Sequence, residues 1–281
     1  MSRLTVELYD AIGDVNPFLI ITDDVPFVDL NDRNGADKAA RVVVKRGSEY
    51  HPGDHVRLLD EVRSVDTDMI TVDPLVAADV DLNAMGFADK AAGLDFQLNP
   101  TGQFRLRIDL HDQLGQPYPN LSLYDWQADP RALIDLNRLH FADKAARAVA
   151  VTGGAYHPAD HVRLLDEVQL VDTDMITVDP LVAADVDLNA MGFADRTAGL
   201  AFELNPGASF DARVELFDTP RQALPNLSLY DWQSPSGFYD LNSLHFADKA
   251  AAVRVVGSRS HIITPIPPIP SQAAPPIRSG P

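Results

Sequence analysis

A 47-residue segment occurs twice in this chain, and this duplication limits the folds open to it. Residues 54–100 recur at 160–206 with only six differences. A shorter period lies within the longer one: the pattern D-L-N followed by A-D-[K/R]-[A/T]-A occurs five times. We call its last five residues the signature, and we number the units 1 to 5 by the aspartates of the signature, Asp37, Asp89, Asp143, Asp195 and Asp248. Tandem units of one size fold alike and stack on their neighbours, so the chain is predicted to be a repeat protein.

Each unit is predicted to consist mainly of β-strands. In unit 1, Val6 and Leu8 alternate with Thr5, Glu7 and Tyr9, and this period of two is typical of a half-buried strand. The other units open in the same way. Further strands are expected at 18–21, 69–72, 121–124, 175–178 and 227–230, and at 41–45, 94–98, 146–151, 200–204 and 252–256. A fourth, short strand is expected in each D-L-N region, and the Ala-rich connection before it could hold a helical turn.

Four strands with one long return connection form a Greek key, which cannot cover its own apolar face. Two such units packed face to face make a sandwich, and two units match the long period of the sequence. We therefore expect units 1 and 2 in residues 1–100, units 3 and 4 in 101–206, a single unit 5 in 207–257, and a tail over 258–281. The sequence leaves a second pairing open, 2 with 3 and 4 with 5, which would leave unit 1 uncovered.

These units resemble the βγ-crystallin family, whose domains are paired Greek keys. The likeness rests on the openings LYD (8–10), LLD (58–60 and 164–166) and LFD (216–218). It rests also on the stretches at 35–44, 86–96, 141–151, 192–202 and 246–256, which are similar to the family's signature and last strand. The resemblance implies an all-β chain of five tandem Greek-key motifs, and it covers about 255 residues.

The family resemblance also implies calcium sites, with Asp37, Asp89, Asp143, Asp195 and Asp248 as candidate ligands. In each copy, however, alanine occupies both the first acidic position and the hydroxyl position of the family's motif. Calcium prefers six to eight oxygen ligands, so sites that lack two side-chain oxygens should bind it weakly or not at all. The alternative is structural: each aspartate caps backbone N–H groups in the turn before the last strand. We expect no other cofactor.

Composition excludes several functions. The chain has no cysteine, and its formal charge of −18 opposes binding to nucleic acids or anionic membranes. No apolar run is long enough for a transmembrane helix and no signal peptide is visible, which favours a cytoplasmic or particle-associated protein. The repeated histidines of HPGDH (51–55) and HPADH (157–161) flank turn residues, so a zinc site there is disfavoured. No catalytic motif occurs, and we expect no enzyme.

Two features suggest contacts with a partner. Trp126 and Trp232 occupy equivalent places in LYDWQ, where they could anchor an interface or stack on a sugar. The tail has seven prolines and no acidic residue, which favours an extended arm that docks on a neighbour through its isoleucines. These include Ile262, Ile263, Ile266 and Ile269.

The leading interpretation is a non-enzymatic structural protein that forms a homo-oligomer or part of a larger assembly. An odd number of units supports it, because one sheet face is left uncovered within the chain. The alternatives are a calcium-binding stress or surface protein, and a carbohydrate- or protein-binding module.

Overall fold

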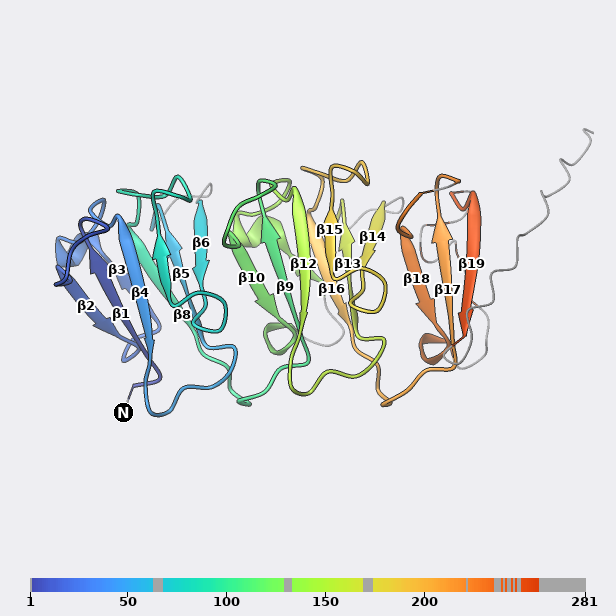
Figure 1. Ribbon diagram of the computed structural model, residues 1–281, viewed down its shortest axis with the longest axis horizontal. Coiled ribbons are helices and arrows are strands. Elements are labelled where there is room, and N and C mark those ends of the chain that lie inside the picture. The colour runs from blue at the N-terminus through green and yellow to red at the C-terminus, as the bar shows by residue number, and fades with distance from the viewer. Residues whose placement is uncertain are drawn as a thin grey trace, which may run out of the picture.

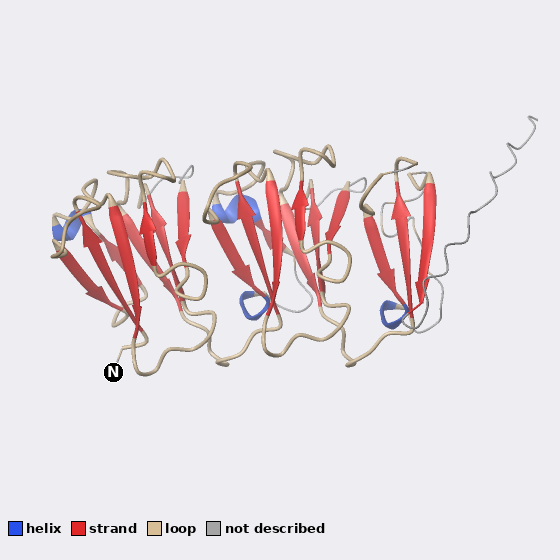
Figure 2. Ribbon diagram, viewed as in Figure 1, coloured by secondary structure: helices blue, strands red, loops and turns tan. Residues whose placement is uncertain are grey.

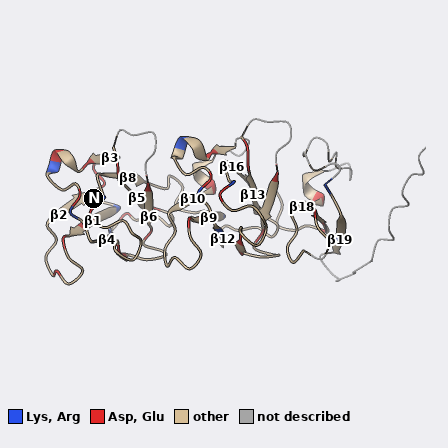
Figure 3. Cartoon of the chain, turned by 90° about the horizontal axis from the view of Figure 1, so that it is seen from above, with Lys and Arg blue, Asp and Glu red and all other residues tan. Residues whose placement is uncertain are grey.

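The computed structural model describes residues 2–62, 68–128, 133–168, 174–220, 222–234, 239, 241, 244, 246 and 249–257. Over these residues the chain is all-β, as predicted, and every pair of neighbouring strands is antiparallel. The sheets follow one another along the long axis in sequence order (Figure 1). The view from above gives the same order (Figure 3). The described helices are four short 3-10 turns (Figure 2).

Units 1 and 2 form two four-stranded sheets with orders β2-β1-β4-β7 and β3-β8-β5-β6. Each unit keeps three of its strands in one sheet and contributes its short third strand to the other. Thus β3 of unit 1 pairs with β8, and β7 of unit 2 pairs with β4. The strands are β1 (Leu4–Tyr9), β2 (Leu19–Thr22), β3 (Phe27–Asp29), β4 (Arg41–Arg46), β5 (His55–Leu59), β6 (Met69–Val72), β7 (Asp79–Asp81) and β8 (Gly93–Gln97).

Units 3 and 4 repeat this exchange. Their sheets have the orders β10-β9-β12-β15 and β11-β16-β13-β14. Here β15 of unit 4 pairs with β12, and β11 of unit 3 pairs with β16. The strands are β9 (Leu106–His111), β10 (Leu121–Tyr124), β11 (Ile134–Asp135), β12 (Arg147–Thr152), β13 (His161–Leu165), β14 (Met175–Val178), β15 (Asp185–Asp187) and β16 (Gly199–Glu203).

Unit 5 forms a three-stranded sheet within the described part of the chain, with the order β18-β17-β19. Its strands are β17 (Ala212–Phe217), β18 (Leu227–Tyr230) and β19 (Ala252–Gly257). The edge of β19 corresponds to the edges of β4 and β12, which receive β7 and β15 from the next unit. Among the described residues, no fourth strand pairs with β19.

The core follows from the alternation in the sequence. In β1, Leu4, Val6 and Leu8 point to one face and are fully buried, and Val42 and Val44 of β4 join them. The facing sheet of unit 2 contributes Val56, Leu58 and Leu94, among others, to the same cluster. Burying each aliphatic side chain of this kind stabilises the fold by about 1.5–3 kcal/mol. Units 3 and 4 have an equivalent core, supplemented by Met69 of unit 2.

The strand predictions agree with the structure to within one residue at each end, and the D-L-N strand predicted for unit 5 lies outside the described residues. The Ala-rich connection after Asp73 holds a single turn of the helical kind, with Val76 N and Ala77 N both donating to Asp73 O at 2.9 Å. The described 3-10 helices lie elsewhere, at Asn31–Arg33, Asp125–Gln127, Leu136–Leu139 and Asp231–Gln233. Alanine has a high helix propensity, but pairing of β7 and β15 with their sheets ends the turn before it becomes a helix. None of the described helices has the length and apolarity needed to span a membrane.

Candidate functional site

The signature turns meet at the centre of each unit pair and bond to one another reciprocally. Asp37 N donates to Ala91 O at 3.1 Å, and Asp89 N donates to Ala39 O at 3.0 Å. The same exchange joins units 3 and 4, where Asp143 N donates to Thr197 O at 2.9 Å. Two copies of one short segment thus recognise each other across an approximate twofold axis. The second and third residues after each aspartate are small, which allows the two backbones to approach closely.

The last two residues of the signature distinguish unit 5 from the other units. In units 1 to 4 both are buried against the paired unit: Ala39, Ala40, Ala91, Ala92, Ala145, Ala146, Thr197 and Ala198. In unit 5 the equivalent Ala250 and Ala251 are exposed. The sequence is the same, so the difference comes from the missing neighbour.

The sheet face of unit 5 differs in the same way. Val44 of β4 and Ala150 of β12 are 1% and 4% exposed, whereas Val255 at the same register of β19 is 52% exposed. Its neighbours Val214 and Val253 are only half-buried. On the same face, Leu216 of β17 and Leu227 and Leu229 of β18 are buried, so the exposed part lies along β19. An apolar sheet face that is covered in two pairs and only partly covered in a third copy is a candidate interaction surface. We call this face, with the edge of β19 and the two alanines, the unit 5 face.

The signature aspartates have a backbone role in the structure. Asp37, Asp89, Asp143 and Asp195 have φ between 54° and 56° and exposed side chains. Aspartate adopts this left-handed conformation more readily than most residues, which explains its recurrence. Within the described residues these side chains make none of the predicted capping hydrogen bonds. Asp248 lies outside the described residues.

The capping role belongs to the aspartate of D-L-N. Asp29 Oδ1 accepts from Asn31 N at 2.9 Å, and Asp81 Oδ1 accepts from Asn83 N at 2.9 Å. Asp135 accepts from Asn137 N in the same way. The invariant spacing of D-L-N could have indicated this, because an aspartate two residues before a turn amide commonly caps it.

Carboxylates gather in one hollow of about 640 Å³ between units 1 and 2. Asp29, Asp32, Asp37, Asp60 and Glu61 line it. Burial, followed by the nearby charge of Asp68, raises the pKa of Asp60 above its usual range. Within the described residues, however, no three acidic or histidine side chains are close enough together to hold a metal ion.

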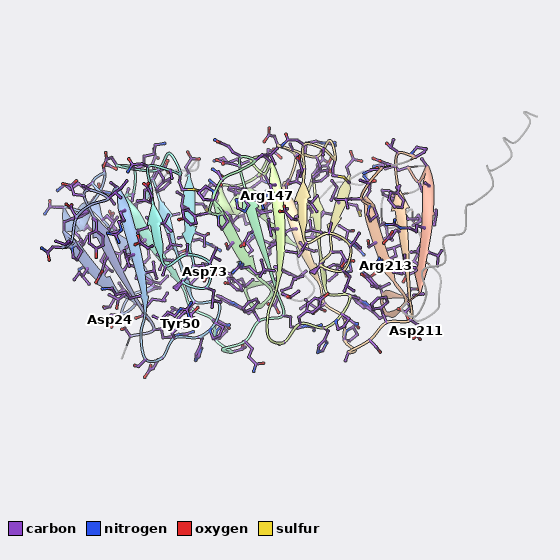
Figure 4. All side chains as sticks on the ribbon, viewed as in Figure 1. Asp24, Tyr50, Asp73, Arg147, Asp211 and Arg213 are labelled. Carbon is purple, nitrogen blue, oxygen red and sulfur yellow. The ribbon has the colours of Figure 1, made fainter. Side chains whose placement is uncertain are left out.

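A buried polar cluster joins unit 2 to unit 3, and it includes Asp73 of unit 2, which is labelled in Figure 4. Arg107 of β9 contacts Asp73 of unit 2 at 3.0 Å and Asp109 at 2.9 Å. Tyr124 OH donates to the same Asp73 carboxylate, and Ser122 Oγ donates to Asp109 at 2.6 Å. All of these side chains are buried. Because an unpaired charge is costly in such a site, the cluster fixes how the two unit pairs meet.

The same cluster recurs between units 4 and 5. Arg213 of β17 contacts Glu215 at 2.7 Å, and Tyr230 OH donates to Asp179 of unit 4. One difference is that Arg254 of β19 also pairs with Glu215. The face of the unit 5 sheet opposite to the unit 5 face is therefore already occupied by unit 4.

The two tryptophans lie beside these clusters. The Trp126 ring lies 6.0 Å from Tyr124 and 6.3 Å from His55 of unit 2, and Trp232 is equally close to His161. Both indoles are half-buried, and each lies near a histidine of the preceding unit. The indole Nε1 atoms of both have no hydrogen-bond partner among the described residues. Their role in partner binding remains a prediction.

The histidines of the two connectors do not face each other. His51 Nδ1 lies 2.9 Å from Asn99 O, whereas His55 is buried in β5 and stacks on Tyr124 at 5.2 Å. Burial, with the nearby charges of Arg57 and Arg107, lowers the pKa of His55 to about 3. The ring is therefore neutral near pH 7. His157 and His161 repeat this arrangement.

Two ion pairs also link neighbouring units. Asp68 bonds to Lys144 at 3.0 Å, and Asp174 bonds to Lys249 at 2.8 Å, so each links an even unit to the following odd one. Ile262, Ile263, Ile266 and Ile269 lie outside the described residues. Comparison of the chain with family models, curated proteins and solved structures finds no match.

Proposed function

We propose that this chain is a non-enzymatic structural protein, built of tandem βγ-crystallin-like Greek keys, that self-associates through the unit 5 face. The observation that carries the proposal is the exposure of Val255 where Val44 and Ala150 are buried. Exposed apolar surface of this kind is a common mark of protein interfaces. The exchange of short third strands within each pair supports the Greek-key part of the proposal.

Sedimentation velocity of the purified full chain tests the proposal. We expect the sedimentation coefficient to rise with concentration through the micromolar range, because the uncovered face drives association. A coefficient that stays at the value of a single chain at every concentration would refute self-association.

Calcium binding is a second candidate, which rests on the resemblance of the signatures and on Asp37 lining the hollow between units 1 and 2, where no three of the described acidic side chains converge. Calorimetric titration of the full chain with CaCl₂ distinguishes the two. Heat of binding together with a higher melting temperature would favour calcium binding. The same titration of the Asp60→Asn variant would then show whether the hollow is the site. Absence of both signals leaves the structural proposal standing alone.

A further inference from the structure

We infer that the partner of the unit 5 face is unit 5 of a second copy of this chain, and that the two copies close into a twofold, end-to-end dimer. This inference rests on the proposed self-association and names its partner. It predicts ten units in one row, with the two unit 5 sheets packed face to face at the centre.

The signature supplies the first argument, because it is self-complementary. In both pairs, the signature of one unit donates to and accepts from the signature of the other, as the bonds from Asp37 N and Asp89 N show. In unit 5 the residue equivalent to the acceptors Ala39 and Ala91 is Ala250, which is exposed together with Ala251. A second copy brings the matching segment, and reciprocal contacts of this kind are the basis of a twofold interface.

The edge of β19 supplies the second argument. The strands β4, β8 and β12 each pair with a short third strand of the neighbouring unit, and one residue on each of them fits the strand that pairs there. Arg41 of β4 and Arg147 of β12 receive even-unit strands and pair with Asp79 and Asp185. Gly93 of β8 instead receives β3 of an odd unit, where an added Cβ would lie 3.2 Å from the Phe27 ring.

Unit 5 has the small residue Ala252 at this register, opposite Phe217 of β17. Its own third-strand sequence, FYDLN at 238–242, matches the odd-unit sequence FVDLN at 27–31. The edge of β19 is therefore suited to a strand from another odd unit.

Charge supplies the third argument, because it disfavours an even unit as partner. Arg3 and Arg105 reach across their pairs to buried Asp54 and Asp160, with Nε–Oδ2 distances of 2.9 and 3.0 Å. In unit 5 this position holds Asp211, at the start of the last sheet (Figure 4). An even unit would place a buried carboxylate against Asp211, and like charges there oppose binding.

By the same alignment, a second unit 5 places Ala212 where an even unit has Asp54. The pairing of two copies thus avoids the repulsion that an even unit would meet.

The opposite end of the molecule explains why association stops at two chains. The outer face of unit 1 has Thr5, Ile20 and Thr22 where unit 3 has Arg107, Ser122 and Tyr124. It also carries the Glu7–Lys45 ion pair. The outer face of unit 1 therefore lacks the polar side chains through which unit 3 binds unit 2. Burying the Glu7–Lys45 ion pair against the apolar unit 5 face would also cost desolvation free energy. Head-to-tail growth is therefore disfavoured.

Sedimentation equilibrium of the full chain tests the inference with two matched variants. Val255→Asp places a carboxylate in the proposed interface, whereas Ile20→Asp makes the same change at a residue of similar exposure, 56%, in unit 1. We expect the wild-type mass to reach a plateau at two chains. Val255→Asp should raise the dimer dissociation constant by about 100-fold or more, and Ile20→Asp should leave it within about twofold.

Ala252→Arg serves as a second interface variant that keeps the fold, since arginine occupies this register in β4 and β12. It should also weaken the dimer, because the second copy offers no aspartate in the place of Asp79. Circular dichroism confirms that each variant is folded. Small-angle scattering of the wild-type dimer should give a longest dimension about twice that of the monomeric Val255→Asp variant.

The outcomes separate this inference from the proposed function. A wild-type mass that grows beyond two chains, or association that Val255→Asp leaves unchanged, would overturn the dimer but keep self-association. A wild-type chain that stays monomeric would overturn both. If the full-length chain with Ile262, Ile263, Ile266 and Ile269 changed to serine dimerises while the wild type stays monomeric, the tail of the same chain covers the face instead.

Discussion

Units 3 and 5 are two copies of one odd-unit type in different surroundings. Both dock an even unit on one sheet face, through Arg107 and through Arg213. Unit 3 also has a paired unit on its other face and is buried from both sides, whereas the equivalent face of unit 5 is exposed along β19, at Val255. The comparison teaches that the repeat encodes two separate interfaces, one polar and one apolar, and that each can be satisfied without the other.

The largest expected difference lies in the polar clusters. Arg107→Ala leaves Asp73 and Asp109 buried without their cation, which we expect to cost about 3–5 kcal/mol. Arg213→Ala should cost less, because Arg254 still pairs with Glu215. Urea denaturation of both variants measures the two losses. Equal losses would mean that Arg254 does not compensate.

Acid should weaken the contact between units 2 and 3 through His55. The pKa of His55 is lowered to about 3 in the fold, whereas an unfolded chain binds the proton at about 6.5. The unfolded state therefore holds more protons below pH 6.5. Stability should fall by about 1.4 kcal/mol per pH unit as the pH drops from 6.5 toward 3.

The His55→Gln variant isolates this contribution, since carboxylates titrate in the same range. The free energy of unfolding of the wild type minus that of the variant should fall by about 1.4 kcal/mol per pH unit as the pH drops from 6.5 toward 3. A difference that is flat between pH 6 and pH 4 would contradict the neutral, buried ring.

Val44 and Val255 occupy the same register, but Val44 is buried and Val255 is exposed. Their alanine variants therefore show how much burial of this sheet face stabilises the fold. Val44→Ala removes two buried methyl groups and should cost about 2 kcal/mol. Val255→Ala should cost less than about 0.5 kcal/mol at concentrations where the chain is monomeric. Thermal or urea unfolding of dilute protein compares them. If the two costs were equal in dilute solution, another part of the same chain would have to cover Val255.

The smallest effect is expected at the turn beside Trp126. Gly53 has φ +92°, and an added Cβ would lie 3.1 Å from Trp126 Nε1. Gly53→Ala should therefore destabilise the chain by about 1 kcal/mol. Unit 4 tolerates alanine at the same place, with Ala159 at φ 75°, so Ala159→Gly should change stability by less than about 1 kcal/mol. Melting temperatures of both variants test this, and an unchanged value for Gly53→Ala would show that the turn relaxes.

Much of the local structure could be predicted from the sequence. The five repeats, with their alternating apolar residues and short apolar stretches, predicted strands such as those at 69–72 and 252–256, because the two faces of a strand alternate with each residue. The D-L-N strand was expected from the same pattern. The docking cluster could not be predicted, because Arg107 and Asp109 fall on the face that alternation assigns to solvent. Their partner Asp73 belongs to another unit.

The sequence by itself determined that this chain is an all-β protein of five similar units, because hydrophobic alternation and repeat length act locally. Only the tertiary structure decided that unit 1 exchanges strands with unit 2 and unit 3 with unit 4. Both pairings bury equivalent apolar residues, so the pattern cannot choose between them. Long-range contacts such as those of Arg3 with Asp54 and Arg107 with Asp73 distinguish the two interfaces. These contacts join residues that are far apart in the sequence, so they form only once the fold brings the residues together.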